Sequence, residues 1–177
     1  MIDYVQIRND ILAGLRSYLR QNTEHNQLLV NESNQKGKEP ERPYLIFSFT
    51  SPYVPEGVNA TEKTELVSHP EPEWDHDIKY SRISNDTMSC SFTVNGQNPD
   101  QTINIGLLAQ EWFKFTGLDY LKSKGLVVVE CMELQNRDTY AVDNWERRQG
   151  FDVIFRVLGE IERTVKTIES VDISEGE

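Results

Sequence analysis

The stretch that decides the fold lies near the carboxyl end of the chain and reads Phe151-Asp152-Val153-Ile154-Phe155-Arg156-Val157. Its apolar residues recur at every second position, which is the period of a half-buried β-strand. The pattern predicts one long strand from Arg148 to about Val165, with Ile161 continuing the apolar face. Charged residues occupy the other face, namely Asp152, Arg156, Glu160 and Glu162. One side of this strand should therefore pack on a core while the other side meets solvent.

Several shorter stretches are also predicted to be strands. Residues 44–50 are aromatic and β-branched and lie between Pro43 and Pro52. Residues 88–94 alternate cleanly, and the turn-forming residues at 84–86 precede them, so residues 78–83 and 88–94 should form a hairpin. Residues 126–134 begin with a continuous apolar run, which predicts a strand buried on both sides in its first half.

Two segments have the 3.6-residue period of amphipathic helices. Asp3 is a suitable N-cap for the first helix, which should span residues 3–22. Its apolar stripe consists of Ile7, Ile11, Leu15, Tyr18 and Leu19. The second helix should span residues 100–116 and end before Gly117, with a stripe of Ile105, Leu108, Trp112 and Phe115. Both stripes need an apolar partner, and the predicted sheet supplies one.

Three other stretches lack such periodicity. Residues 22–42 form a polar connector, within which residues 27–30 are compatible with a short strand or turn. Residues 52–75 are acidic and rich in proline, which predicts a long irregular loop that becomes ordered against a neighbouring protein. The last four residues, 174–177, should be disordered.

These elements predict an α+β fold built as a two-layer sandwich. Two main helices should pack on a mainly antiparallel sheet of about five strands, from which the long acidic loop projects. Residues 1–173 should form a single domain, because the 177-residue length fits one domain and no second core is evident. We expect one shared core that contains Ile11, Leu15, Leu108, Trp112, Phe151, Val153 and Phe155.

Composition excludes several classes of function. The chain carries 18 Lys and Arg against 29 Asp and Glu, a net charge of −11, which argues against a general nucleic-acid binder. The longest apolar run, residues 125–129, is too short to cross a membrane, and the amino terminus lacks the pattern of a signal peptide. Cys90 and Cys131 lie within predicted strands, so we expect buried, reduced thiols.

Catalytic motifs are weak throughout the sequence. The cluster Asp75-His76-Asp77 invites a metal or acid–base role, but adjacent side chains in extended structure point to opposite faces. His25 and His69 lie in polar stretches without a nucleophile near them in the sequence. We therefore expect no catalytic site, no cofactor and no metal. A small metal-dependent hydrolase remains a less favoured alternative.

Association is the function that the sequence favours. Trp145, Arg147 and Arg148 precede the long strand, and Trp and Arg are enriched where partners bind tightly. Trp74 lies beside the acidic stretch and invites the same interpretation. These four residues are the candidate subunit interface. The alternative is a solvated entry to the strand with one half-buried Trp.

The same region carries a resemblance to a known family. Residues 145–153 read Trp145-Glu146-Arg147-Arg148-Gln149-Gly150-Phe151-Asp152-Val153. Together with residues 43–46, 125–129, 136–138 and 167–171, this run resembles bacteriophage neck or tail terminator proteins. The resemblance covers the first helix and most of residues 43–173, whereas the stretches 22–42 and 52–75 fall outside it.

The resemblance implies a structural virion protein. Such proteins form a ring, usually of six subunits, that caps the head-proximal end of the tail tube, stops its growth and joins it to the head connector. The implied partners are further copies of the chain, the tail tube protein and the connector, while genomic DNA passes through the lumen without specific binding. We expect the ring to assemble in the bacterial cytoplasm, even where the isolated protein is monomeric. Another head-tail adaptor or a tail completion protein remains an alternative.

Overall fold

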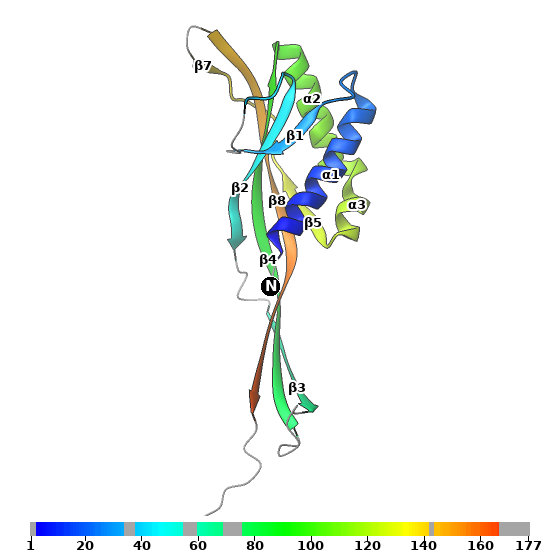
Figure 1. The fold of residues 1–177 in the computed structure, drawn as a ribbon, viewed down its shortest axis with the longest axis vertical. Helices are drawn as coiled ribbons and strands as arrows, with labels where there is room; N and C mark the ends of the chain where they lie inside the picture. Colours follow the sequence, from blue (N-terminus) through cyan, green and yellow to red (C-terminus); the bar gives the residue numbers. More distant parts are fainter. Residues whose placement is uncertain (1–2, 34–37, 55–59, 69–75, 142–143, 167–177) are drawn as a thin grey trace, which may run out of the picture. The chain divides into compact units, whose positions relative to one another are not determined.

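The computed structural model describes residues 3–33, 38–54, 60–68, 76–141 and 144–166. Its elements follow in the order α1 (Tyr4–Asn22), β1 (Leu29–Glu32), β2 (Tyr44–Val54), β3 (Thr61–Ser68), β4 (His76–Gly96), α2 (Pro99–Glu111), the π-helix η2 (Trp112–Thr116), α3 (Leu118–Ser123), β5 (Leu126–Cys131), β6 (Gln135–Asn136), β7 (Thr139–Ala141) and β8 (Asn144–Lys166) (Figure 1). Chain contacts define two compact units. The helical unit comprises residues 3–55 and 86–157, and the strand unit comprises residues 1–2, 56–85 and 158–177.

The expected mixed α+β class is confirmed, but the sheet is larger than predicted. Eight strands pair, with the main order β1-β2-β4-β8-β5, and β3, β6 and β7 pair beside this path. β1 joins β2 in parallel, whereas β2 and β3 pair with β4, and β5, β6 and β7 pair with β8, in antiparallel orientation. The prediction of about five strands was wrong because short strands in polar sequence have no apolar alternation to reveal them.

Two polar stretches contain strands that the sequence did not predict. Residues 61–68, inside the predicted acidic loop, form β3 and pair with β4 from Thr61↔Ile83 to Ser68↔His76. The polar stretch 135–141 contains β6 and β7, both paired with β8. The short strand near residue 30 is confirmed as β1. Pairing with a neighbouring strand stabilises these segments although their own composition does not favour β structure.

The predicted hairpin at residues 84–86 was also wrong. β4 runs without a break from His76 to Gly96, straight through Ser84, Asn85 and Asp86. Pairs to other strands lie on both sides of this point, at Ile83 with β3 and at Thr87 with β2. Ladder hydrogen bonds therefore hold the chain extended where local turn propensity would fold it back.

The core of the helical unit lies between its helices and one face of its strands. Figure 1 shows α1, α2 and α3 together on one side of β2, β4 and β8. At the centre is a cluster of almost fully buried aromatic rings, made by Phe47, Phe92, Phe113, Phe151 and Phe155. Ile11, Leu15 and Trp112 are buried with them, as predicted. Leu108, however, is only half-buried.

The amino-terminal helix forms as its sequence predicts. Asp3 caps it, because its Oδ1 accepts a hydrogen bond from the Gln6 backbone N–H at 3.0 Å. Gly14 weakens the helix intrinsically but has a packing role. A Cβ at Gly14 would lie 2.4 Å from the Tyr120 ring and 2.7 Å from the Trp112 ring. The glycine therefore lets α1 approach these two aromatic side chains closely.

The stripe predicted for the second helix was only partly right. Phe115 is 77% exposed, whereas Phe113 is fully buried. At about 100° per residue, the buried positions Ile105, Ala109 and Trp112 define a face that continues to Phe113 and leaves Phe115 on its flank. Ile161, predicted on the core face of β8, is also exposed.

Candidate assembly surfaces

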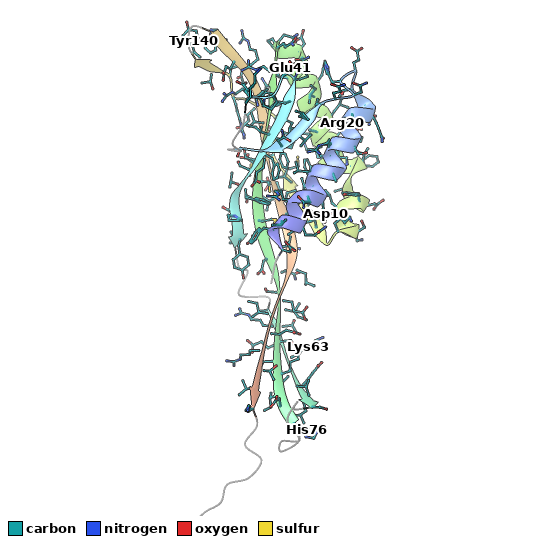
Figure 2. The ribbon with its side chains drawn as sticks, viewed as in Figure 1. Asp10, Arg20, Glu41, Lys63, His76 and Tyr140 are labelled. Atoms are coloured by element: carbon teal, nitrogen blue, oxygen red, sulfur yellow. The ribbon has the colours of Figure 1, made fainter. Side chains whose placement is uncertain are left out.

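Three of the four residues proposed for the interface meet at the β7–β8 hairpin. Tyr140 and Trp145 are cross-strand partners, and their rings pack edge to face with centroids 5.4 Å apart. The Arg147 guanidinium lies 5.7 Å from the centre of the Trp145 ring. Trp145 is 53% exposed, and Figure 2 shows Tyr140 at the outer end of the hairpin. Trp74 lies outside the described residues.

Both arginines of this group have partners within their own chain. Arg147 Nη1 lies 2.8 Å from Asp138 Oδ2, and the Arg148 backbone N–H donates to Asp138 Oδ1 at 2.7 Å. Burial alone would raise the pKa of Asp138, but these hydrogen bonds and the Arg147 charge outweigh it and lower that pKa. The Arg148 side chain pairs with Glu146. Each guanidinium therefore already pairs with a carboxylate of its own chain.

The ion pairs continue to the start of β2. Arg42 Nη2 lies 3.3 Å from Glu146 and 3.1 Å from Glu39. The Tyr44 hydroxyl donates to Glu39 at 2.8 Å. Burial and this hydrogen bond raise the pKa of Tyr44 to about 12, and the hydrogen bonds from Tyr44 and Arg42 lower the pKa of Glu39. The network fixes the hairpin base to β2 and leaves the aromatic pair as the exposed feature.

A second surface, which the sequence did not reveal, is the outer strand β5. This strand lies at one end of the main strand order. Val127 and Val129 are 48% and 49% exposed, contrary to the expectation that this run is buried on both sides. Met132 just beyond the strand is also exposed. A continuous apolar run is typical of an interior strand, so sequence alone could not distinguish burial within the fold from burial against a partner.

The helices expose a third apolar group. Leu107 on α2, Phe115 on η2 and Leu118 at the start of α3 are all exposed. Single exposed apolar residues are ordinary on a protein surface. Phe115, however, exposes most of its aromatic side chain to solvent. The 3.6-residue period predicted that Phe115 belongs to the core. This prediction was wrong, because the Phe115 side chain is exposed.

Arg137 stabilises the face of the sheet opposite the buried aromatic cluster. Its Nη1 donates to Ser91 Oγ at 2.7 Å and to Thr93 Oγ1 at 3.3 Å, and its Nη2 lies 3.0 Å from Asp152. Burial alone would raise the pKa of Asp152, but hydrogen bonds from Ser91 and Arg137 lower it. Arg137 thus ties the segment after β6 to β4 and β8.

The described residues offer little for catalysis. They contain no group of three or more His, Cys, Asp or Glu side chains placed to hold a metal ion. Burial raises the pKa of the Cys90 thiol to about 12 and that of Cys131 to about 11, so neither is a ready nucleophile. Cys90 is buried as expected, and Cys131 is partly exposed.

One polar cleft of about 620 Å³ lies beside the end of α1, lined in part by Arg20, His25 and Arg42. Two of the side chains that line it bond to other residues of the chain. Arg20 Nε donates to the Leu28 carbonyl at 3.1 Å, and His25 Nε2 lies 3.1 Å from the Gln101 side-chain amide. The residues that line the cleft include no Ser, Thr or Cys, so they supply no hydroxyl or thiol nucleophile.

The chain matches the model of a known family. The model of a family described as phage neck terminator protein matches residues 9–177, nearly the whole chain. The chain belongs to this family. No curated protein sequence matches it significantly.

Membership of the neck terminator family confirms the resemblance seen in the sequence and gives the chain a structural role in the phage neck or tail. A protein at that place in the virion contacts other phage proteins, and the exposed surfaces described above are candidates for such contacts. In the part of the chain that the structure describes, no helix is long and apolar enough to cross a membrane.

Proposed function

We propose that this neck terminator forms a homo-hexameric ring on the head-proximal end of the tail tube, ends tube polymerisation and joins the tail to the head connector. The observation that supports the proposal most is the outer strand β5, which ends the main order of the described strands and exposes the side chains of Val127 and Val129. An open strand edge is a template for pairing with another chain.

Ring closure needs two different surfaces on each subunit, because a closed ring of more than two copies uses head-to-tail contacts. The helical unit offers two such surfaces. One is the β5 edge, and the other is the aromatic pair Tyr140 and Trp145 at the β7–β8 hairpin. Exposed Trp and Tyr side chains commonly dominate the binding energy of an interface.

The acidic composition suits a conduit for DNA. With a net charge of −11, carboxylates outnumber basic groups over the chain as a whole. A lumen lined with carboxylates repels phosphate and lets the genome pass without binding.

The test is electron microscopy of purified protein, alone and mixed with tails that lack a terminator. Wild-type protein should cap tail tubes at one end as rings, even where the protein alone is monomeric. Trp145→Ala and Val129→Glu should each lower the fraction of capped tubes at least tenfold, because each alters a proposed contact. Val5→Glu is the matched control, since Val5 is equally exposed but lies on α1.

Trp145→Ala is a sharper variant than charge reversal at Arg147 and Arg148. Reversal would place like charges beside Asp138 and Glu146 and so disturb the fold as well as the surface. Normal capping by both Trp145→Ala and Val129→Glu would contradict the proposed ring contacts. Protein found on isolated heads rather than on tails would favour the adaptor role instead.

A further inference from the structure

The strand β1 lies at one end of the main strand order and β5 lies at the other. Among the described strands, β1 pairs with β2 alone. A strand with a neighbour on one side turns half of its backbone N–H and C=O groups away from the sheet, and these groups can pair with a strand of another chain unless something covers them. The contacts of β1 show what covers its outer edge.

The ladder between β1 and β2 identifies the backbone groups that β1 turns outward. The Ser33 backbone N–H, directly after the strand, donates to the Phe47 carbonyl of β2 at 2.7 Å. The direction of the backbone groups alternates from residue to residue along a strand. The odd-numbered residues of 29–33 therefore face β2, and the even-numbered residues of 28–32 turn their N–H and C=O groups to the outer edge.

Two arginines of α1 bond these outward carbonyls. Arg16 Nη2 donates to the Val30 carbonyl at 2.6 Å, and Arg20 Nε donates to the Leu28 carbonyl at 3.1 Å. The outward N–H of Leu28 is also bonded, since it donates to the His25 carbonyl at 2.9 Å. Hydrogen bonds from a charged donor are stronger than those between neutral groups. Two successive acceptors of the outer edge are thus already bonded within the chain.

A third arginine of the same helix pairs at the end of the strand. Arg8 Nη1 lies 3.2 Å from Glu32 Oε2. Arg8, Arg16 and Arg20 are separated by multiples of four residues, which places them on one side of α1. The helix contacts β1, and its arginines extend to the outer edge of that strand. The polar side of this amphipathic helix therefore has a definite structural partner.

We propose that the arginines of α1 block the addition of a foreign strand to β1. Arg16 and Arg20 occupy the carbonyls that an incoming strand would need as acceptors. Proteins commonly protect an outer strand with charged side chains or by covering it with a helix, and β1 has both forms of protection. Of the two strands that end the main order, β5 is then the one at which a partner strand can pair.

The block has a consequence for assembly. If both outer strands were open, β1 of one copy could pair with β5 of the next, and this head-to-tail contact could be repeated without limit. Head-to-tail contacts produce open filaments wherever the rotation between copies does not close a ring. The arginines of α1 prevent such growth through the sheet. Because the proposal depends on contacts within one chain, it holds whether or not the proposed ring forms.

Removal of the two arginines tests the block. Full-length Arg16→Ala/Arg20→Ala protein is compared with Lys114→Ala/Lys122→Ala, a control that loses the same two positive charges at exposed helical positions. In sedimentation velocity at equal concentration, the fraction of protein in species larger than the wild-type assembly should rise at least tenfold in the arginine variant. It should stay within twofold of wild type in the control. Equal fractions in the two variants would overturn the proposal.

A proline at Glu32 shows whether the association occurs at β1. Glu32 turns its N–H outward, so proline there removes a donor of the outer edge and leaves the ladder to β2 intact. Adding Glu32→Pro to the arginine variant should return the large species to the wild-type level. Large species that persist in the triple variant would overturn the proposal, because the association would then arise elsewhere.

A single substitution covers the case in which the double arginine variant does not fold. Arg20 is partly exposed, and Arg20→Ala frees only the Leu28 carbonyl. This variant should raise the fraction of large species at least threefold, and a fraction equal to that of wild type would overturn the proposal. If the arginine variants associate as expected but wild-type protein does not cap tail tubes, the block at β1 stands and the proposed function fails.

Discussion

Truncation of Phe92 to Ala should remove the centre of the aromatic core. Phe92 is fully buried, and its ring lies 5.7 Å from Phe47, 4.7 Å from Phe113 and 5.5 Å from Phe151, measured between centroids. Phe→Ala changes in cores cost about 3–5 kcal/mol. Because three ring pairs are lost together, and each is worth about 0.5–1.5 kcal/mol beyond its buried area, we expect a loss near the upper end, about 4–5 kcal/mol.

Phe115→Ala is the matched control, because it makes the same chemical change at a ring that is 77% exposed. Its effect on the free energy of unfolding should stay within about 0.5 kcal/mol. Urea titrations followed by circular dichroism measure both values. In thermal scans, Phe92→Ala should lower the melting temperature by roughly 8–20 °C, at about 2–4 °C per kcal/mol for a chain of this size.

The reasoning is refuted if Phe92→Ala costs less than about 2 kcal/mol, or if Phe115→Ala costs as much as Phe92→Ala. Should Phe92→Ala fail to fold at all, Phe92→Leu provides the measurement. It keeps most of the apolar volume and should cost about 1–2 kcal/mol. Phe115→Ala also has an assembly readout, since a loss of tube capping without a loss of stability would identify this ring as a contact with a partner.

Three further predictions follow from the same contacts. Phe155→Ala should cost about 3–5 kcal/mol and the half-buried Leu108→Ala only about 1–2 kcal/mol, as urea titration will show; equal losses would mean that both positions are core. Because the pKa of Asp138 is lowered, its ionised form stabilises the fold above about pH 4, and this contribution is lost as the pH falls through the lowered pKa. A plot of melting temperature against pH should therefore be shallower below about pH 4 for Asp138→Asn than for the wild-type protein. An unchanged slope would refute the pairing of Asp138 with Arg147. Because burial raises the pKa of Cys90 to about 12 and that of Cys131 to about 11, both thiols should react slowly with iodoacetamide at pH 8 in the native protein and rapidly in urea, and rapid native labelling of Cys90 would contradict its burial.

The local pattern of apolar residues predicted much of the secondary structure of this protein. The alternation in residues 151–157 predicted the long strand that became β8, and the 3.6-residue period predicted α1 together with its cap at Asp3. Phe151, Val153 and Phe155 are buried as their spacing indicated. Such patterns succeed because they depend only on which neighbours along the chain share a face, and backbone geometry fixes that sharing. The run at residues 145–153 also led to the correct family.

The tertiary structure decided which surfaces remain exposed. Nothing local distinguishes Val127 and Val129 in an outer strand from the same residues in an interior strand, because only long-range pairing places β5 at the end of the strand order. The same pairing kept residues 84–86 extended against their turn propensity, and it turned part of the acidic stretch into β3. The sequence could indicate that Arg147 pairs with a carboxylate, but only the folded chain shows that this carboxylate is Asp138 of the same chain. Exposure and pairing are properties of strands brought together from distant parts of the chain, and therefore no window of neighbouring residues contains them.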